Sequence, residues 1–306
     1  MVGGAALLVG CTGSPDTKAP EVLPVDPKVP TPTASADSSL STTFALITDY
    51  GTCDEGERQV ADMVASWSPR IVATAGNNTD GGVNCTPYTQ SVGDYYAGYL
   101  GGSDGAHFFP VPGNQDVANA STGDDEYSKF FGFLILMSDA DPRWYKVNNG
   151  NVNLFMLDSE VPADALDAQK EWLQQQLSHA RTEEPGFWNV VVLNHPPFTS
   201  GPDQPNTAMR PEAGWDYKGW GANVVVSGRQ KVWEELNVDG LPYIVAGVGA
   251  TGTGQECPST LVPESKGCIA GTGAVLVNGF TDKLTLEYRT PDGGAGATKA
   301  TVTVKR

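Results

Sequence analysis

The chain has 306 residues, of which 40% are hydrophobic and 9% aromatic, enough for one large domain or two small ones around a substantial core. Its formal net charge is −17, from 36 acidic and 19 basic residues. Sequence-independent binding to nucleic acids needs Lys and Arg against the phosphates, so this charge argues against nucleic acids as partners, and it suits a soluble, exported protein.

The first eleven residues are mostly small and apolar and end in a cysteine. Leu8-Val9-Gly10-Cys11 resembles the lipobox of bacterial lipoproteins, in which the cysteine is lipidated after cleavage. We interpret residues 1–11 as a signal-peptide remnant that lacks a Lys/Arg region, and we predict lipidation at Cys11. An apolar tail with an accidental cysteine is the alternative. The resemblance implies an exported protein, at the bacterial cell surface or extracellular, which meets the membrane only through an N-terminal lipid anchor.

Residues 12–42 are rich in Pro, Ser, Thr, Ala and Asp and contain no aromatic residue. A segment of this composition cannot bury enough apolar surface to fold, so it predicts a flexible linker. The sequence after it shows no internal repeat and no second linker. We therefore expect a single folded domain over residues 43–306.

Strands and helices alternate through this domain. Apolar residues at helical spacing, Val60, Met63, Val64 and Trp67, predict a helix over residues 55–67. Further helices are expected near residues 89–100 and over 162–180, and buried strands over 43–48, 71–74, 107–111, 151–157, 190–193, 224–226 and 243–247. This order predicts an α/β fold with parallel strands and helical crossovers. The alternating segments 274–277, 283–288 and 300–304 predict an antiparallel finish.

Four cysteines remain after Cys11. An even number in an exported chain predicts two disulfides. Cys257 and Cys268 enclose a loop rich in Pro, Gly and Ser and are expected to pair, which leaves Cys53 to pair with Cys85. No CxxC or Cys/His spacing indicates a zinc site.

Polar residues follow five of the predicted strands. The five blocks are Asp49-Tyr50-Gly51, Gly76-Asn77-Asn78, Gly113-Asn114-Gln115-Asp116, Asn194-His195-Pro196-Pro197 and Ser227-Gly228-Arg229-Gln230-Lys231. In α/β folds, ligands bind at the edge where the carboxyl ends of the strands meet. We therefore expect these blocks to converge on one site.

The order and spacing of the five blocks resemble the calcineurin-like metallophosphoesterases, especially their purple acid phosphatase-like branch. Those proteins carry D-x-G, G-D-x-x-Y, G-N-H-[DE], V-x-x-H and G-H-x-H blocks, and the similarity runs from about Phe44 to Tyr288. The resemblance implies a four-layer α/β/β/α sandwich with mixed sheets and a site at the sheet edge. It also implies two metal ions, which activate a bridging water and neutralise a phosphoryl group.

Two metal-ligand positions of this family are kept and three other positions of the first blocks are altered. Asp49 matches the first metal ligand and Asn114 matches the Asn ligand, so these two are the candidate metal ligands. Asn77 stands where the family has the Asp that bridges both metals, and Asp80 falls where the branch has its Tyr. Gln115 replaces the His that protonates the leaving group, and an amide cannot act as a general acid because it does not titrate.

The imidazole ligands of the later blocks are missing as well. Asn194 replaces the metal-binding His of V-x-x-H, counting Val191 as the V, and His195 is its neighbour. Arg229 and Lys231 replace both His of G-H-x-H. Arg has no lone pair to offer a metal, and Lys would first have to lose its proton. We therefore assign no catalytic residue, although His195 could be a base instead of a structural residue before a Pro-Pro turn.

The substitutions place cations where metal ligands stood. We hypothesise that Asp49 with Arg229 or Lys231 forms a metal-free substitute for the dimetal centre, with Asp80 and Asp116 close by. At about 4 Å and an effective dielectric constant near 20, each ion pair contributes roughly 4 kcal/mol before desolvation is subtracted.

Three functions are compatible with this set of residues. The first is a pseudophosphatase without a cofactor, secreted or lipid-anchored, that binds an unknown protein or an anionic ligand at a surface. The second is an active phosphomonoester or phosphodiester hydrolase with one divalent metal ion, held by Asp49, Asp80, Asn114 and either Asn194 or His195. The third is a metal-free anion-binding module in which Arg229 and Lys231 hold the phosphoryl group.

Overall fold

The computed structural model describes residues 1, 40–80, 82–101, 105–117, 126–136, 141–250 and 254–306. Cys11 and residues 12–39 lie outside the described residues, so the lipid anchor and the linker stay predictions. The first strand begins at Leu40 instead of at the expected domain boundary of residue 43.

The described residues form two mixed β-sheets. The first has the strand order β13-β12-β11-β1-β2-β3. Its strands are β1 (Leu40–Ile47), β2 (Val72–Thr74), β3 (Phe108–Pro110), β11 (Ala274–Phe280), β12 (Lys283–Thr290) and β13 (Ala297–Lys305). Strands β1, β2 and β3 are parallel, whereas β11, β12 and β13 continue antiparallel from the other side of β1.

The second sheet has the strand order β10-β8-β9-β7-β6-β5-β4. Its strands are β4 (Tyr145–Asn149), β5 (Val152–Met156), β6 (Trp188–Leu193), β7 (Val224–Ser227), β8 (Trp233–Val238), β9 (Leu241–Ala246) and β10 (Ser265–Ile269). Strands β5, β6, β7 and β9 are parallel, and β4, β8 and β10 are antiparallel to their neighbours.

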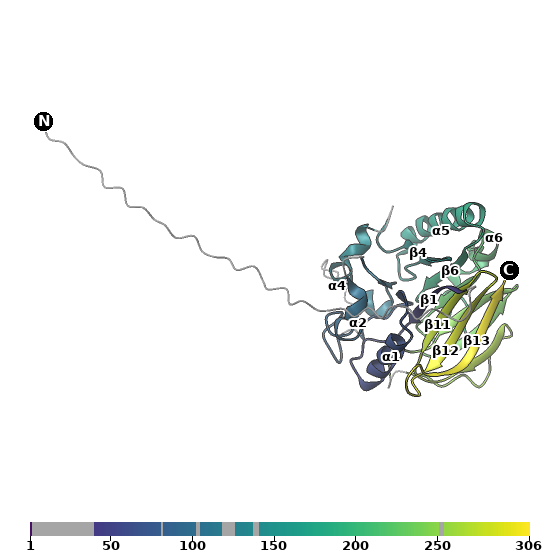
Figure 1. The fold of residues 1–306 in the computed structure, drawn as a ribbon. Helices are drawn as coiled ribbons and strands as arrows, with labels where there is room; N and C mark the ends of the chain where they lie inside the picture. The colour runs from purple at the N-terminus through teal and green to yellow at the C-terminus, as the bar shows by residue number, and fades with distance from the viewer. Residues whose placement is uncertain (2–39, 81, 102–104, 118–125, 137–140, 251–253) are drawn as a thin grey trace.

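Helices cover the outer faces of the two sheets. Helices α1 (Glu55–Ser66) and α2 (Gly93–Leu100) belong to the core of the first sheet, and α5 (Ala163–Glu183) and α6 (Tyr217–Trp220) pack on the second. Figure 1 shows α5 and α6 on the opposite side of the molecule from α1. The shorter elements are α3 (Asn114–Val117), α4 (Glu126–Phe130), η2 (Gly132–Leu136), η3 (Thr207–Met209) and η4 (Pro211–Ala213). This arrangement is the expected four-layer sandwich.

Local sequence explains where the main helices lie. Helix α1 begins after Asp54, whose side chain accepts a hydrogen bond from the backbone N–H of Glu57, and it buries Val60, Met63 and Val64. Between the sheets, Trp233 of β8 stacks on Tyr288 of β12 with ring centroids 5.1 Å apart. None of the helices in the described residues is long and apolar enough to cross a membrane.

Three strands were not predicted. In β8 the acidic Glu234 is fully buried, because Thr199 and Ser200 donate hydrogen bonds to its carboxylate. Strand β4 has a polar alternation, and β10 contains a glycine and has no fully buried residue. Helix α2 begins at Gly93 instead of near residue 89, and α5 continues to Glu183 instead of ending at residue 180.

Candidate functional site

Four residues at the strand ends have a left-handed backbone conformation. The φ angle is 48° at both Asp49 and Asn77, which follow β1 and β2, and it is 70° at Arg229 and 59° at Lys231, which follow β7. Asp and Asn tolerate this conformation, but for Arg and Lys it is strained. Strained backbone at one edge of the fold is typical of a functional site, and here it sets the direction of the polar groups.

Two glycines allow these strand ends to approach one another. A Cβ atom on Gly113 would clash with Oδ1 of Asn77, and one on Gly228 would lie 2.6 Å from the carbonyl oxygen of Ala75. Any side chain at either position would separate the segments. The glycines of the G-N-Q and S-G-R blocks therefore have a geometric role in closing the site.

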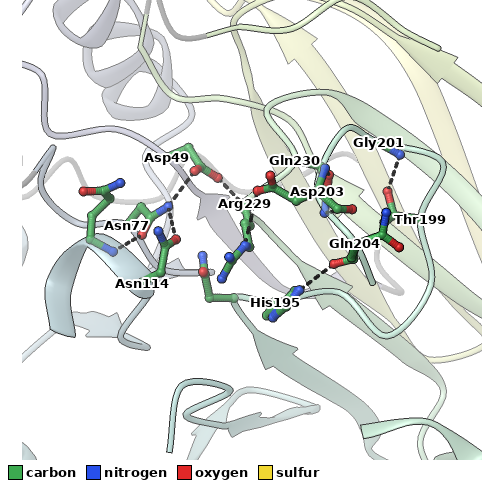
Figure 2. Close-up of polar contacts among 12 residues, drawn as sticks. Asp49, Asn77, Asn114, His195, Thr199, Gly201, Asp203, Gln204, Arg229 and Gln230 are labelled. Atoms are coloured by element: carbon green, nitrogen blue, oxygen red, sulfur yellow. Dashed lines mark hydrogen bonds and ion pairs between the residues drawn. The ribbon is translucent and has the colours of Figure 1, made fainter. Parts of the chain in front are cut away.

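The side chain of Asn77 lies at the centre of the site (Figure 2). Its Nδ2 donates to Oδ1 of Asp49 at 2.9 Å and to Oδ1 of Asn114 at 3.2 Å. Its Oδ1 accepts from the backbone N–H of Gln115 at 3.0 Å. Since a backbone N–H can only donate, this contact fixes the orientation of the amide, and its NH₂ group faces Asp49 and Asn114.

Asp49 is buried and accepts three hydrogen bonds from described residues. Its Oδ2 accepts from Oγ1 of Thr48 at 2.8 Å and from the backbone N–H of Arg229 at 2.6 Å. Its Oδ1 accepts the bond from Asn77. Burial raises the pKa of Asp49, while these hydrogen bonds and the charge of Lys231 oppose the rise. The carboxylate is thus stabilised mainly by neutral donors.

The side chain of Arg229 does not pair with Asp49. Its Nη1 lies 3.3 Å from Glu160, and its Nε lies 3.3 Å from Asp203. The hypothesis of an ion pair between the Arg229 guanidinium and Asp49 is therefore wrong. Because of the left-handed turn, the backbone N–H of Arg229 points to Asp49 (Figure 2). Its side chain leaves towards Glu160 and Asp203.

Lys231 faces a small cavity at the sheet edge. The cavity has a volume of about 100 Å³, and its lining includes Asp49, Asp80, Gln115 and Lys231. The charge of Lys231 lowers the pKa of Asp49 against the effect of burial. Within the described residues, however, no ion pair joins Lys231 to a carboxylate. The cation and the carboxylate thus share a cavity without direct contact.

The two other acidic residues of the hypothesis have different positions. Asp80 lines the cavity, but its carboxylate also accepts from the backbone N–H groups of Gly82, Val83 and Asn84 and so shapes the loop. Asp116 is buried and is not among the residues that line the cavity. It accepts from both nitrogens of Asn78, from the backbone of Gly113 and from the hydroxyl of Tyr88. Burial raises the pKa of Asp116 to about 7. It holds the loops together and does not join Asp49.

The block after β6 makes hydrogen bonds that join neighbouring segments. Asn194 is fully buried, and its Nδ2 donates to the carbonyl oxygen of Ala75 at 2.7 Å. The His195 ring lies with Nε2 2.7 Å from the carbonyl oxygen of Gln204, and its backbone N–H donates to Oγ of Ser159. These contacts favour the structural interpretation of His195, which anchors the loop around Gln204.

The donor set does not fit the two metal ions that the resemblance implies. Asn77 directs hydrogens, not lone pairs, at Asp49 and Asn114. Cationic side chains occupy the sequence positions of two imidazole ligands, and neither can coordinate a metal at neutral pH. Within the described ranges, no three His, Cys, Asp or Glu side chains are grouped so that they could hold a metal ion. No catalytic step through a metal follows from this set.

Both predicted disulfides are present, and one of them braces the site. Cys53 pairs with Cys85 and Cys257 with Cys268. The first joins the loop after β1 to the loop after β2. Both of these loops line the cavity, the first through Thr52 and the second through Asp80.

Sequence reasoning missed Glu57. It is fully buried in α1, and its Oε2 accepts from the backbone N–H of Cys53 at 2.6 Å. Burial raises the pKa of Glu57 to about 8, although backbone hydrogen bonds from Cys53 and Gly51 oppose the rise. The Asp54-x-x-Glu57 spacing of a capping box was the available signal.

No protein-family model matches the sequence, and no curated protein matches it. Several solved structures do. GAP50, the anchor in the inner membrane complex of Plasmodium, superposes with a TM-score of 0.68 at 17% identity, over 87% of this chain and 89% of its own. A purple acid phosphatase from yellow lupin seeds has a TM-score of 0.67 at 14% identity, over 88% of this chain but 54% of its own, so this chain spans about half of that protein.

A dimetal phosphatase from Danio rerio superposes with a TM-score of 0.60 at 12% identity, over 87% of this chain and 99% of its own. Together with the two mixed sheets, these likenesses show that the chain has the calcineurin-like metallophosphoesterase fold. The fold that the five strand-end blocks implied is confirmed.

Proposed function

We propose that the chain is a pseudophosphatase, in which hydrogen bonds replace the dimetal centre and which acts by binding instead of by hydrolysis. The observation that carries this proposal is the pair of hydrogen bonds from Nδ2 of Asn77 to Asp49 and Asn114. A bridging carboxylate needs cations between itself and these oxygens. The Asn77 amide satisfies the same oxygens with its own hydrogens, so the site is stable without metal.

The residues for proton transfer support the same conclusion. Gln115 takes the sequence position of the family's acid, and an amide has no proton to give at neutral pH. His195 would be the nearest alternative by sequence, but its Nε2 is in hydrogen-bond contact with the Gln204 carbonyl. A hydrolase would need another acid and another way to activate water.

The proposed place of action is outside the cell, on a membrane surface. Two disulfides are typical of exported proteins. The sequence Leu8-Val9-Gly10-Cys11 offers a lipid anchor, and residues 12–39 would then act as the tether. The likeness to GAP50, which is an anchor in a membrane complex, supports a binding role on this fold. Cys11→Ser should move the protein from the membrane fraction to the soluble fraction, and an unchanged distribution would reject the lipid anchor.

A hydrolysis assay tests the loss of catalysis. Purified protein is incubated with a chromogenic phosphomonoester and a chromogenic phosphodiester, with added Mn²⁺, Zn²⁺ or Fe²⁺, beside an active dimetal phosphatase of the same fold. We expect no metal-dependent hydrolysis by this chain. Hydrolysis that Asp49→Asn abolishes would show that the site is active and would refute the proposal.

A further inference from the structure

The cavity beside Asp49 combines opposite charges that do not touch. Asp49 and Asp80 line it together with the ammonium-bearing Lys231, and no described ion pair joins Lys231 to either carboxylate. Asp49 is only 3% exposed, yet within the part of the chain that the structure describes its Oδ1 accepts a single hydrogen bond, from Asn77. A carboxylate oxygen can accept two, so one acceptor position of Oδ1 remains for a ligand.

A buried hydroxyl without a described partner lies in the same wall. Thr52 lines the cavity and is 5% exposed, and its buried hydroxyl has no hydrogen-bond partner among the described residues. Buried polar atoms are normally satisfied, so an unpartnered hydroxyl beside a cavity points to a missing ligand or water. Gln115 also lines the cavity, and its side chain carries an amide donor and an amide acceptor.

The charge balance disfavours a phosphoryl group. A dianion in the cavity would face both Asp49 and Asp80, with Lys231 as the cation among the residues that line it. The guanidinium of Arg229, which could have offset these carboxylates, is held by Glu160 and Asp203. A ligand with one positive and one negative group matches the lining better, because each group would meet its opposite charge.

The volume limits the ligand to a small molecule. Pockets for drug-sized ligands have roughly 300–1,000 Å³. A cavity of about 100 Å³ is well below this range. A single water needs roughly 10–15 Å³, so the cavity has room for roughly seven to ten waters, and a molecule of the size of the smallest amino acids fits within it.

We propose that this cavity binds a small zwitterion, an amino acid of the size of glycine or alanine, with its ammonium group at Asp49 and its carboxylate at Lys231. Gln115 and the hydroxyl of Thr52 complete the polar lining. The inference rests on the proposed function, since metal ions at Asp49 would occupy the ammonium position.

Calorimetry on the unmodified protein tests the charge pattern without any substitution. Glycine, alanine and β-alanine are titrated beside acetate, methylammonium and inorganic phosphate. We expect at least one of the three amino acids to bind at least about tenfold more tightly than acetate or methylammonium, because each of these offers only one of the two charges. Phosphate binding in place of amino acids, or no binding of any amino acid, would overturn the proposal.

Variants locate the site. Lys231→Met should weaken amino-acid binding at least about tenfold, whereas Lys170→Met on α5, whose ammonium pairs with Asp167, should leave it unchanged. Lys231→Arg keeps the charge and should retain binding. Equal affinity of Lys231→Met and the unmodified protein would contradict the assignment.

A failure of the proposed function can be distinguished from a failure of the zwitterion proposal. Binding of stoichiometric Mn²⁺ or Zn²⁺, measured on the same protein without amino acids, would reject the metal-free site. An absence of both metal and amino-acid binding would reject only the zwitterion.

Discussion

The side chain of Asn77 donates a hydrogen bond of 2.9 Å from Nδ2 to Oδ1 of Asp49. In a dimetal site of this fold, a carboxylate at the position of Asn77 would be negative and would need cations. An amide changes the group from acceptor to donor, and the two strand ends attract each other directly. This relationship defines the site as a hydrogen-bonded network.

Asn77→Asp should destabilise the protein. The introduced carboxylate would face the oxygens of Asp49 and Asn114, and two donated hydrogen bonds would be lost. We expect the free energy of unfolding in urea to fall by about 2–4 kcal/mol at pH 7. The pKa of the introduced carboxyl would be raised, so the loss should be smaller at pH 5 than at pH 7.

Asn206→Asp is the matched control for this variant. Asn206 is half-buried in the loop before η3, and its only described hydrogen bonds are made by its backbone. Its free energy of unfolding should change by less than about 0.5 kcal/mol. Equal effects of the two substitutions would show that the Asn77 amide has no special role.

Glu57 should make stability depend on pH. Burial raises the pKa of Glu57 to about 8, so the folded state holds a proton that the unfolded chain loses near pH 4.5. The folded state therefore binds more protons between these values, and the contribution of Glu57 to stability is present at low pH and is lost as pH rises towards 8.

Glu57→Gln should remove this part of the pH dependence. The amide oxygen can still accept from the Cys53 N–H, and no proton is needed. In thermal unfolding experiments, the melting temperature of this variant should decline less from pH 5 to pH 8 than that of the unmodified protein. Glu55→Gln, an exposed change on the same helix, is the control and should keep the original decline. An equal decline in Glu57→Gln would show that Glu57 is ionised when folded.

The two disulfides should contribute unequally. Cys53–Cys85 has a sequence separation of 32 residues and Cys257–Cys268 one of 11. A longer closed loop restricts the unfolded chain more. The free energy of unfolding should therefore fall by about 1 kcal/mol more in the double Ala variant at Cys53 and Cys85 than in the double Ala variant at Cys257 and Cys268. Urea unfolding of both variants measures the difference. A larger loss for the pair Cys257 and Cys268 would contradict this account.

Two substitutions of Arg229 should separate the effect of backbone strain on stability from the effect of ion pairing. Both Arg229→Ala and Arg229→Gly lose the contacts with Glu160 and Asp203. Only glycine adopts a φ of 70° without strain, so the Gly variant should be about 1 kcal/mol more stable than the Ala variant. Thermal or urea unfolding of the two variants measures this difference. A more stable Ala variant would show that this backbone conformation is not strained.

The sequence predicted the fold and the strand-end positions because both depend on local pattern. Apolar runs followed by polar blocks identified β1, β2, β3, β6 and β7, and the order of the blocks identified the fold. Strand β8 was missed because its buried Glu234 looks like a surface residue until Ser200 is beside it.

Side-chain directions could not be predicted in the same way. The φ of 70° at Arg229 turns its guanidinium away from Asp49, and nothing in the local sequence indicates a left-handed Arg. The donor role of Asn77 likewise depends on a backbone N–H at Gln115, which follows a different strand. Both directions come from contacts between segments that are distant in the chain.

Metal analysis of the purified protein tests the central claim most directly. The protein is incubated with Mn²⁺, Zn²⁺ or Fe²⁺, dialysed, and measured by mass spectrometry beside an active dimetal phosphatase of the same fold. The hydrogen-bonded site predicts no stoichiometric metal and no rise in thermal stability when metal is added. Two tightly bound ions per chain, lost in Asp49→Asn, would contradict it.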